Sequence, residues 1–188
     1  VTWSSDVCSS DLVSDKAMEV MEHRKVPVAS FYCNLLTFKN YKKEKWFPYT
    51  MPASDINGLE EAVRLVQEDT ERITRHEKIA QAVRQAVTAA GLSLYLNFGD
   101  ANTVTVIRVP EGMKDTDIIR HMKETYGILI SGSFDVLAGK EIRLGHMGNN
   151  ARKDEVAAML EALEKTLADL GFVCKKSMAE EFAKVLDS

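Results

Sequence analysis

The sequence has few of the residues that mark secreted or membrane-bound proteins. Its 188 residues include only three cysteines, Cys8, Cys33 and Cys174, which lie far apart. An odd and scattered set argues against a disulfide framework and against a metal cluster, and it fits a reducing compartment. No apolar run approaches the roughly 20 residues of a membrane-spanning helix, and no basic start leads into an apolar stretch as in a signal peptide. We therefore expect a cytoplasmic protein that does not enter the membrane.

An excess of positive charge is also lacking. The chain has 24 Lys and Arg against 28 Asp and Glu, which gives a net charge of −4. A nucleic-acid-binding protein usually has a basic stripe or a basic total, so we expect no nucleic-acid partner. With 10 Gly, 4 Pro and 45% apolar residues, the chain is neither linker-like nor disordered. Its length fits one domain, or one and a piece.

The first twelve residues differ from the rest of the chain. They read VTWSSDVCSSDL, and six of the twelve are Ser or Asp with no helical or strand period. The stretch resembles the translation of a common sequencing adapter, so we interpret residues 1–12 as a non-native scar and exclude them from the fold. An ordinary disordered N-terminus is the alternative. If the scar is real, the native sequence was interrupted just before Val13.

Periodicity and capping residues predict an α+β chain. Residues 31–38 fit either a strand or a short helix, and the basic stretch 39–45 fits a loop. From residue 92 onward the order of elements predicts a small domain with helices on one face of a largely antiparallel sheet. The expected helices begin at Asp15, at Ser54 or Asp55, at Asp69 or Thr70, at Asp115, at Asn150 and at Ser177. The expected strands cover 92–96, 104–109, 128–130 and 141–145.

Two common catalytic motifs begin in this sequence and fail. His76-Glu77 starts like a zinc-protease helix, but Ala80 stands where the second histidine ligand is required. We interpret this segment as the solvated face of a long helix and expect no metal site. Gly139-Lys140 resembles the end of a phosphate-binding loop, but it lacks the Ser or Thr that holds magnesium.

Two segments remain as candidate sites. One is the loop from Phe47 to Pro52, in which two prolines bracket aromatic residues and exclude a helix. The other contains Arg143, an arginine inside an apolar strand flanked by glycines. A guanidinium is always charged, and its planar fork matches a carboxylate. On spacing alone, Arg143 could equally face solvent or form a structural ion pair.

These segments carry a resemblance to a known family. Residues 13–171 resemble the C-terminal portion of class V, fold-type I, pyridoxal-phosphate-dependent aminotransferases, in particular the alanine–glyoxylate and serine–pyruvate group. The shared segments, in order, are Val13-Ser14-Asp15-Lys16-Ala17, Ser30-Phe31-Tyr32, Phe47-Pro48-Tyr49-Thr50-Met51-Pro52, Gly58-Leu59-Glu60-Glu61-Ala62, Thr103-Val104-Thr105, Arg108-Val109-Pro110-Glu111-Gly112 and Ala138-Gly139-Lys140 running into Ile142-Arg143-Leu144-Gly145-His146-Met147-Gly148.

The resemblance implies an α/β enzyme that acts as a homodimer with pyridoxal 5'-phosphate. It implies that the enzyme moves an amino group between a small amino acid of the alanine or serine type and a 2-oxo acid of the glyoxylate or pyruvate type. Arg143 matches the arginine that binds the substrate α-carboxylate. Thr50 matches the threonine that reaches the cofactor phosphate of the other subunit. Some members carry a tyrosine at the position of Phe47, which cannot donate a hydrogen bond, and Tyr49 is a possible substitute.

The resemblance also divides the chain. Residues 13–53 would be the end of the large cofactor-binding domain with its interface loop, 54–91 connecting helices, and 92–188 the small C-terminal domain. The lysine that forms the Schiff base lies upstream of the Ser-Asp-Lys-Ala segment in the family, where residues 1–12 contain no lysine. We therefore expect an inactive fragment with no catalytic lysine. A non-enzymatic α+β regulatory domain that senses a small molecule is the alternative.

Overall fold

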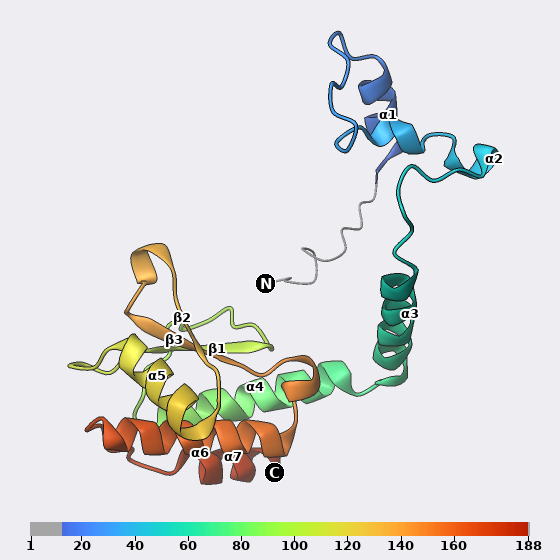
Figure 1. Cartoon of the computed structure of the whole chain (residues 1–188). Coiled ribbons are helices and arrows are strands. Elements are labelled where there is room, and N and C mark those ends of the chain that lie inside the picture. The colour runs from blue at the N-terminus through green and yellow to red at the C-terminus, as the bar shows by residue number, and fades with distance from the viewer. Residues whose placement is uncertain (1–12, 188) are drawn as a thin grey trace. The chain divides into compact units, whose positions relative to one another are not determined.

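The chain falls into two compact units. The computed structural model describes residues 13–187, so the suspected adapter segment lies outside the described residues. The first unit ends at Glu68 and the second begins at Asp69 (Figure 1). No helix among residues 13–187 is long and apolar enough to cross a membrane.

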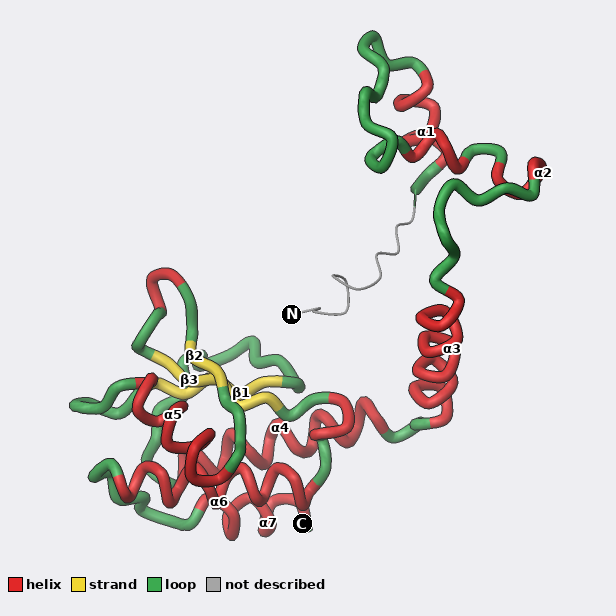
Figure 2. The backbone as a smooth tube through the Cα atoms, viewed as in Figure 1, coloured by secondary structure: helices red, strands yellow, loops and turns green. Residues whose placement is uncertain are grey.

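The second unit is built on a small antiparallel sheet. Its strands are β1 (Val104–Arg108), β2 (Ser131–Gly132) and β3 (Glu141–Gly145), in the order β1-β3-β2 (Figure 2). The central strand β3 pairs with β1 over five residues and with β2 over two. Strands β1 and β3 are therefore as the sequence predicts, to within one residue at the end of β1.

Four helices cover one face of this sheet. They are α4 (Arg72–Ala89), α5 (Asp115–Tyr126), α6 (Lys153–Asp169) and α7 (Met178–Leu186) (Figure 1). Helices α4 and α5 contact the sheet, α6 packs on α5, and α7 packs on both α4 and α6. Short 3-10 turns, η3 (Asp135–Leu137) and η4 (Gly148–Asn150), flank β3. The predicted architecture, an antiparallel sheet with helices on one face, is confirmed.

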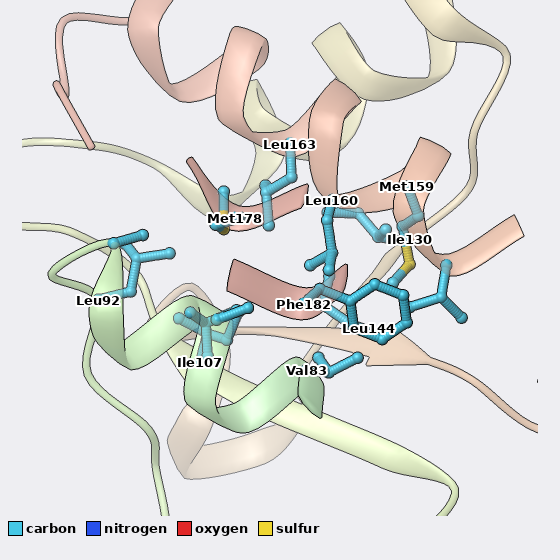
Figure 3. Close-up of a cluster of buried hydrophobic side chains, with 14 of the residues drawn as sticks. Val83, Leu92, Ile107, Ile130, Leu144, Met159, Leu160, Leu163, Met178 and Phe182 are labelled. Atoms are coloured by element: carbon cyan, nitrogen blue, oxygen red, sulfur yellow. The ribbon is translucent and has the colours of Figure 1, made fainter. Parts of the chain in front are cut away.

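The core lies between the sheet and the helices. Alternate strand residues point into it, among them Ile107, Ile142 and Leu144, each at most 1% exposed. Phe182 of α7 is fully buried and lies close to Leu144 and Val83 in Figure 3. Helix α4 contributes six buried residues. It is thus part of the core of the second unit, although the sequence analysis groups it with connecting helices; the functional division of the chain into domains stays a prediction.

The first unit contains short helices and one long one. They are α1 (Asp15–Glu22), η2 (Leu35–Phe38), α2 (Tyr41–Glu44) and α3 (Ala53–Glu68). Ser14 caps α1 as predicted, because its side chain accepts a hydrogen bond from the Ala17 amide. Helix α3 buries none of its side chains. Its apolar residues Ile56, Leu59, Val63, Leu65 and Val66 are all exposed.

Some predicted elements are wrong or displaced. The basic stretch expected as a loop contains the helical turn α2, which ends at Lys45 in the left-handed region. Residues 92–96 make only one bridge, from Leu94 to Ile107, and residues 128–130 form no strand because pairing with β3 begins at Ser131. Helix α6 begins after Arg152 and not at Asn150, since Asn150 ends the turn η4.

Candidate functional site

Arg143 lies on the face of the sheet opposite the helices. Strand alternation decides this, because its neighbours Ile142 and Leu144 point into the core. Arg143 is directly opposite Val106 on β1 and Ser131 on β2. It is half-buried at the centre of β3. Strand β3 is hydrogen-bonded to β1 on one side and to β2 on the other.

The guanidinium of Arg143 is fixed at one edge and open at the other. Its Nε donates a hydrogen bond to the Gly132 carbonyl at 2.8 Å. Its Cζ lies 4.9 Å from the ring centroid of Phe134, in a cation–π contact. Among residues 13–187 no carboxylate lies within ion-pair distance of it. The structural ion pair that spacing alone allowed is therefore absent from this part of the chain, and the two Nη groups stay available for a ligand.

The turn that contacts Arg143 is connected to β3 a second time. Ser133 donates a hydrogen bond of 3.4 Å to Oε2 of Glu141. Glu141 is only 1% exposed, and within the described residues its Oε1 has no hydrogen-bond partner. Gly139 has a φ of +79°, which a residue with a side chain adopts only at a cost, and it allows the chain to turn back into β3.

A buried histidine follows β3. The His146 side chain is fully buried, and its Nε2 lies 2.9 Å from Oγ1 of Thr105. Its Nδ1 makes no hydrogen bond to any described residue. Burial lowers the pKa of His146 to about 4, and the nearby charge of Arg84 acts in the same direction. The ring is therefore neutral at pH 7.

His76 is engaged in a structural contact. Its Nδ1 lies 2.5 Å from the Arg72 carbonyl, and its Nε2 accepts a hydrogen bond from the Gly148 amide at 2.9 Å. A carbonyl only accepts and an amide only donates, so the ring carries its proton on Nδ1. The interpretation of this segment as a solvated helix face is wrong for His76, which connects α4 to the turn after β3.

Thr50 lies in the first unit, in a segment without helix or strand, as the prolines predict. It is exposed, and its hydroxyl makes no hydrogen bond to residues 13–187. Its neighbour Tyr49 stacks on Tyr32, with ring centroids 5.2 Å apart, and donates its hydroxyl proton to the Phe31 carbonyl. That proton is therefore not available to a phosphate. The ring of Phe47 packs against Phe38.

A cavity of about 790 Å³ lies beside Thr50. Its charged lining is mostly acidic, with Asp15, Glu19 and Glu22 against one cation, Lys39. That cation forms an ion pair of 2.5 Å with Glu22. Excess negative charge repels an anion, so this cavity does not suit a phosphate group and we place none in it.

No lysine of the described chain is placed to form an imine with a buried aldehyde. From Lys16 on α1 to Lys184 on α7, every lysine among residues 13–187 is exposed. Catalytic lysines of this kind are activated by burial or by a second cation. The described residues therefore do not fit the reactive end of pyridoxal phosphate. Arg143 and Thr50 belong to different units, so we assign them no common site within one chain.

Comparison with known proteins identifies the fold. No protein-family model matches the chain. It is 38% identical to an uncharacterized aminotransferase of Methanocaldococcus jannaschii over 93% of its own length and 46% of the relative. It is 35% identical to the L-aspartate–glyoxylate aminotransferase of Paracoccus denitrificans, over 84% and 40%.

A solved structure gives the same result. The pyridoxamine–pyruvate aminotransferase of Mesorhizobium loti superposes with a TM-score of 0.78 at 30% identity, over 93% of this chain and 46% of that one. The fold is that of the matching part of a fold-type I aminotransferase. The chain spans less than half the length of each of these aminotransferases.

Three residues around this site are not predicted by the sequence. Phe134 gives no signal, because an isolated aromatic residue in a loop has no pattern. Glu141 and His146 were not expected to be buried, since strand alternation alone predicts no cover over Glu141 and no partner for His146. Thr105, the partner of His146, is 41 positions away in the sequence.

Proposed function

We propose that this chain is the substrate-carboxylate-binding part of a class V pyridoxal-phosphate-dependent aminotransferase. The observation that carries the proposal is the guanidinium of Arg143, which is held at Nε and has no carboxylate partner among the described residues. The similarity to aminotransferases over most of the chain supports the same reading. No relative named above is a sensing domain, so the regulatory alternative gains no support.

The substrates we propose are an amino acid and a small 2-oxo acid. The names of the two relatives with a stated reaction pair glyoxylate or pyruvate with different amino donors, L-aspartate and pyridoxamine. Glyoxylate and pyruvate share a carboxylate next to a carbonyl, and they differ by one methyl group. A carboxylate-binding arginine is the group that such a set of substrates needs in common. The amino donor of this protein, which we propose to be of the alanine or serine type, depends on other contacts.

Arg143 acts by orientation in this proposal. Its two Nη groups donate parallel hydrogen bonds to the two oxygens of the α-carboxylate, which fixes the plane as well as the position of the acid. The α-carbon is then presented in one direction only, and orientation of this kind contributes to rate. Bound pyridoxal phosphate would supply the electron sink of the reaction. Because the described residues lack a suitable lysine, we derive no step through the cofactor.

Thr50 is the group that this chain offers to a cofactor phosphate. Its exposed hydroxyl has no partner among residues 13–187, so it is free to donate a hydrogen bond to a group outside its own unit. This is compatible with the role in which the threonine reaches the site of the other subunit. We accordingly propose a homodimer, and we propose the cytoplasm as its compartment.

The test uses the complete gene product that contains this chain. We expect transamination of glyoxylate or pyruvate, and we expect both Arg143→Lys and Arg143→Ala to lower kcat/KM for the amino acid by at least one to two decades. That range corresponds to the loss of a charge-assisted hydrogen bond of about 1.5–3 kcal/mol. Lysine keeps the charge but loses the planar fork.

A simple amine without a carboxylate is the control substrate. Its reaction should be the same in the parent and in both variants, because it cannot use Arg143. Near-parental kcat/KM for the amino acid in both variants would remove Arg143 from the site. An equal loss with the amine would show that Arg143 is only structural.

A further inference from the structure

Three consecutive residues hold the end of the Arg143 side chain and the strand that carries it. Gly132 accepts a hydrogen bond from Nε, Phe134 contacts the guanidinium with its ring, and Ser133 donates to the buried Glu141 on the same strand. Glu141 precedes Arg143 by two residues and so lies on the same face of β3. We call residues 132–134 the clamp.

The clamp restricts the guanidinium in two different ways. The hydrogen bond from Nε to Gly132 fixes where one edge points, but it leaves the plane free to rock about that bond. A cation–π contact favours a cation over the face of an aromatic ring, so Phe134 limits the rocking. The two constraints together leave one open edge, formed by Nη1 and Nη2.

We propose that Phe134 is a positioning residue for Arg143, and that its aromatic ring, beyond its bulk, holds the guanidinium in the orientation that receives a carboxylate end-on. The proposal rests on the proposed function, because it assumes that Arg143 binds an acid. Phe134 itself is 68% exposed. Phe134 does not belong to the hydrophobic core, and its ring contact is with Arg143.

The hydrogen bond between Ser133 and Glu141 holds the clamp against β3. Glu141 is 1% exposed. The Ser133–Glu141 hydrogen bond joins the turn to β3 at the residue between Gly132 and Phe134. Asp135, directly after Phe134, has a φ of +50°, an uncommon conformation for a residue with a side chain. The turn is thus held in a specific shape on both sides of the ring.

The experiment measures the side-chain Nε–H signal of Arg143 by NMR in the 188-residue chain. The variants are Phe134→Leu, which keeps apolar bulk, and Phe134→Tyr, which keeps the ring. Val136→Ala is the matched control, because Val136 is exposed on the same turn, and the ring that contacts Arg143 is that of Phe134. The hydrogen-exchange rate of Nε–H measures how firmly the clamp holds the guanidinium. Titration with sodium acetate, followed by the shift of the Arg143 signal, measures carboxylate binding. The melting temperature checks that each variant folds.

We expect Phe134→Leu to speed the exchange of Nε–H about 2- to 5-fold and to weaken acetate binding by a similar factor, which is the size of an exposed cation–π contact. Phe134→Tyr and Val136→Ala should match the parent in both measurements. Parental exchange in Phe134→Leu would overturn the proposal, even if the melting temperature falls. Equally fast exchange in Phe134→Tyr would overturn it too, because the ring would then not be the cause.

The acetate arm separates this inference from the proposed function. In one outcome, acetate leaves the Arg143 signal of the parent unchanged, while Phe134→Leu speeds Nε–H exchange and Phe134→Tyr does not. The role of Phe134 in the clamp is then supported, and the carboxylate-binding role of Arg143 fails. If acetate binds equally well to all variants, Arg143 keeps its role and Phe134 loses the one proposed for it.

Discussion

Acidification should destabilise the second unit through His146. The ring is buried and neutral, with a pKa of about 4 against an ordinary 6.5. Between these two values the unfolded chain binds a proton that the folded chain does not, so the free energy of unfolding falls as the pH falls. Above pH 6.5 both states are neutral and the effect vanishes; below pH 4 both are protonated and it stops growing.

The size of the effect follows from the pKa difference. At 1.36 kcal/mol per unit, a shift of this size is worth about 3 kcal/mol in full, and about 2 kcal/mol between pH 7.5 and 5. That window lies above the ordinary range of carboxylates, so Asp and Glu contribute little to it. Arg84 and His76 on α4 are the charged or titratable groups near the ring, and a positive charge on either opposes one on His146.

The assay is urea unfolding between pH 5 and 7.5, followed by amide NMR signals of α6 and α7, which report the second unit alone. His146→Gln removes the titrating group, and its pH dependence should be flatter than the parental one by about 2 kcal/mol over this window. His23→Gln is the matched control, since His23 is exposed in the first unit. If the parent and His146→Gln show the same slope, His146 does not have the depressed pKa on which the reasoning depends.

Two further predictions concern the cofactor and the first unit. In the first, the 188-residue chain is incubated with pyridoxal phosphate and reduced with borohydride. We expect no single lysine to be labelled stoichiometrically, because every described lysine is exposed. One fully labelled lysine, found by peptide mapping, would contradict this. The chain should also bind an apolar dye and self-associate through α3, whose five apolar side chains are exposed. Leu59→Gln with Val63→Gln should reduce both in scattering and fluorescence measurements, whereas Gln67→Ala should not, and a parental chain that is monomeric and dye-free would refute the idea.

Local chemistry made much of the fold predictable. Ser14 caps a helix where the sequence places it, and the last helix begins directly after Ser177, within one residue of the predicted start. Gly127 ends α5 in the left-handed conformation that glycine adopts readily. Strands β1 and β3 follow from β-branched and alternating residues. These features depend on neighbours in sequence, so single-sequence patterns suffice to predict them.

Non-local packing explains most of the errors. The apolar faces of α3 and α4 look alike in sequence, yet α4 is in the core of the second unit and α3 buries nothing. Strand β2 begins at Ser131 and not in the more apolar stretch before it, because the register against β3 is set by tertiary pairing. In the candidate site, Arg143 was found from its unusual place in a strand, but the residues that hold it were not.

The two faces of the sheet in the second unit separate the residues of the core from the residues around Arg143. One face carries Ile107, Ile142 and Leu144, whose replacement would open cavities in the core. The other carries Val106 and Arg143, which no helix of this unit covers. A strand sends successive side chains to opposite sides, so a substitution at one position leaves its neighbour's environment largely intact. Selection can therefore alter the surface around Arg143 on β1 and β3 while the packing that keeps those strands in place stays the same.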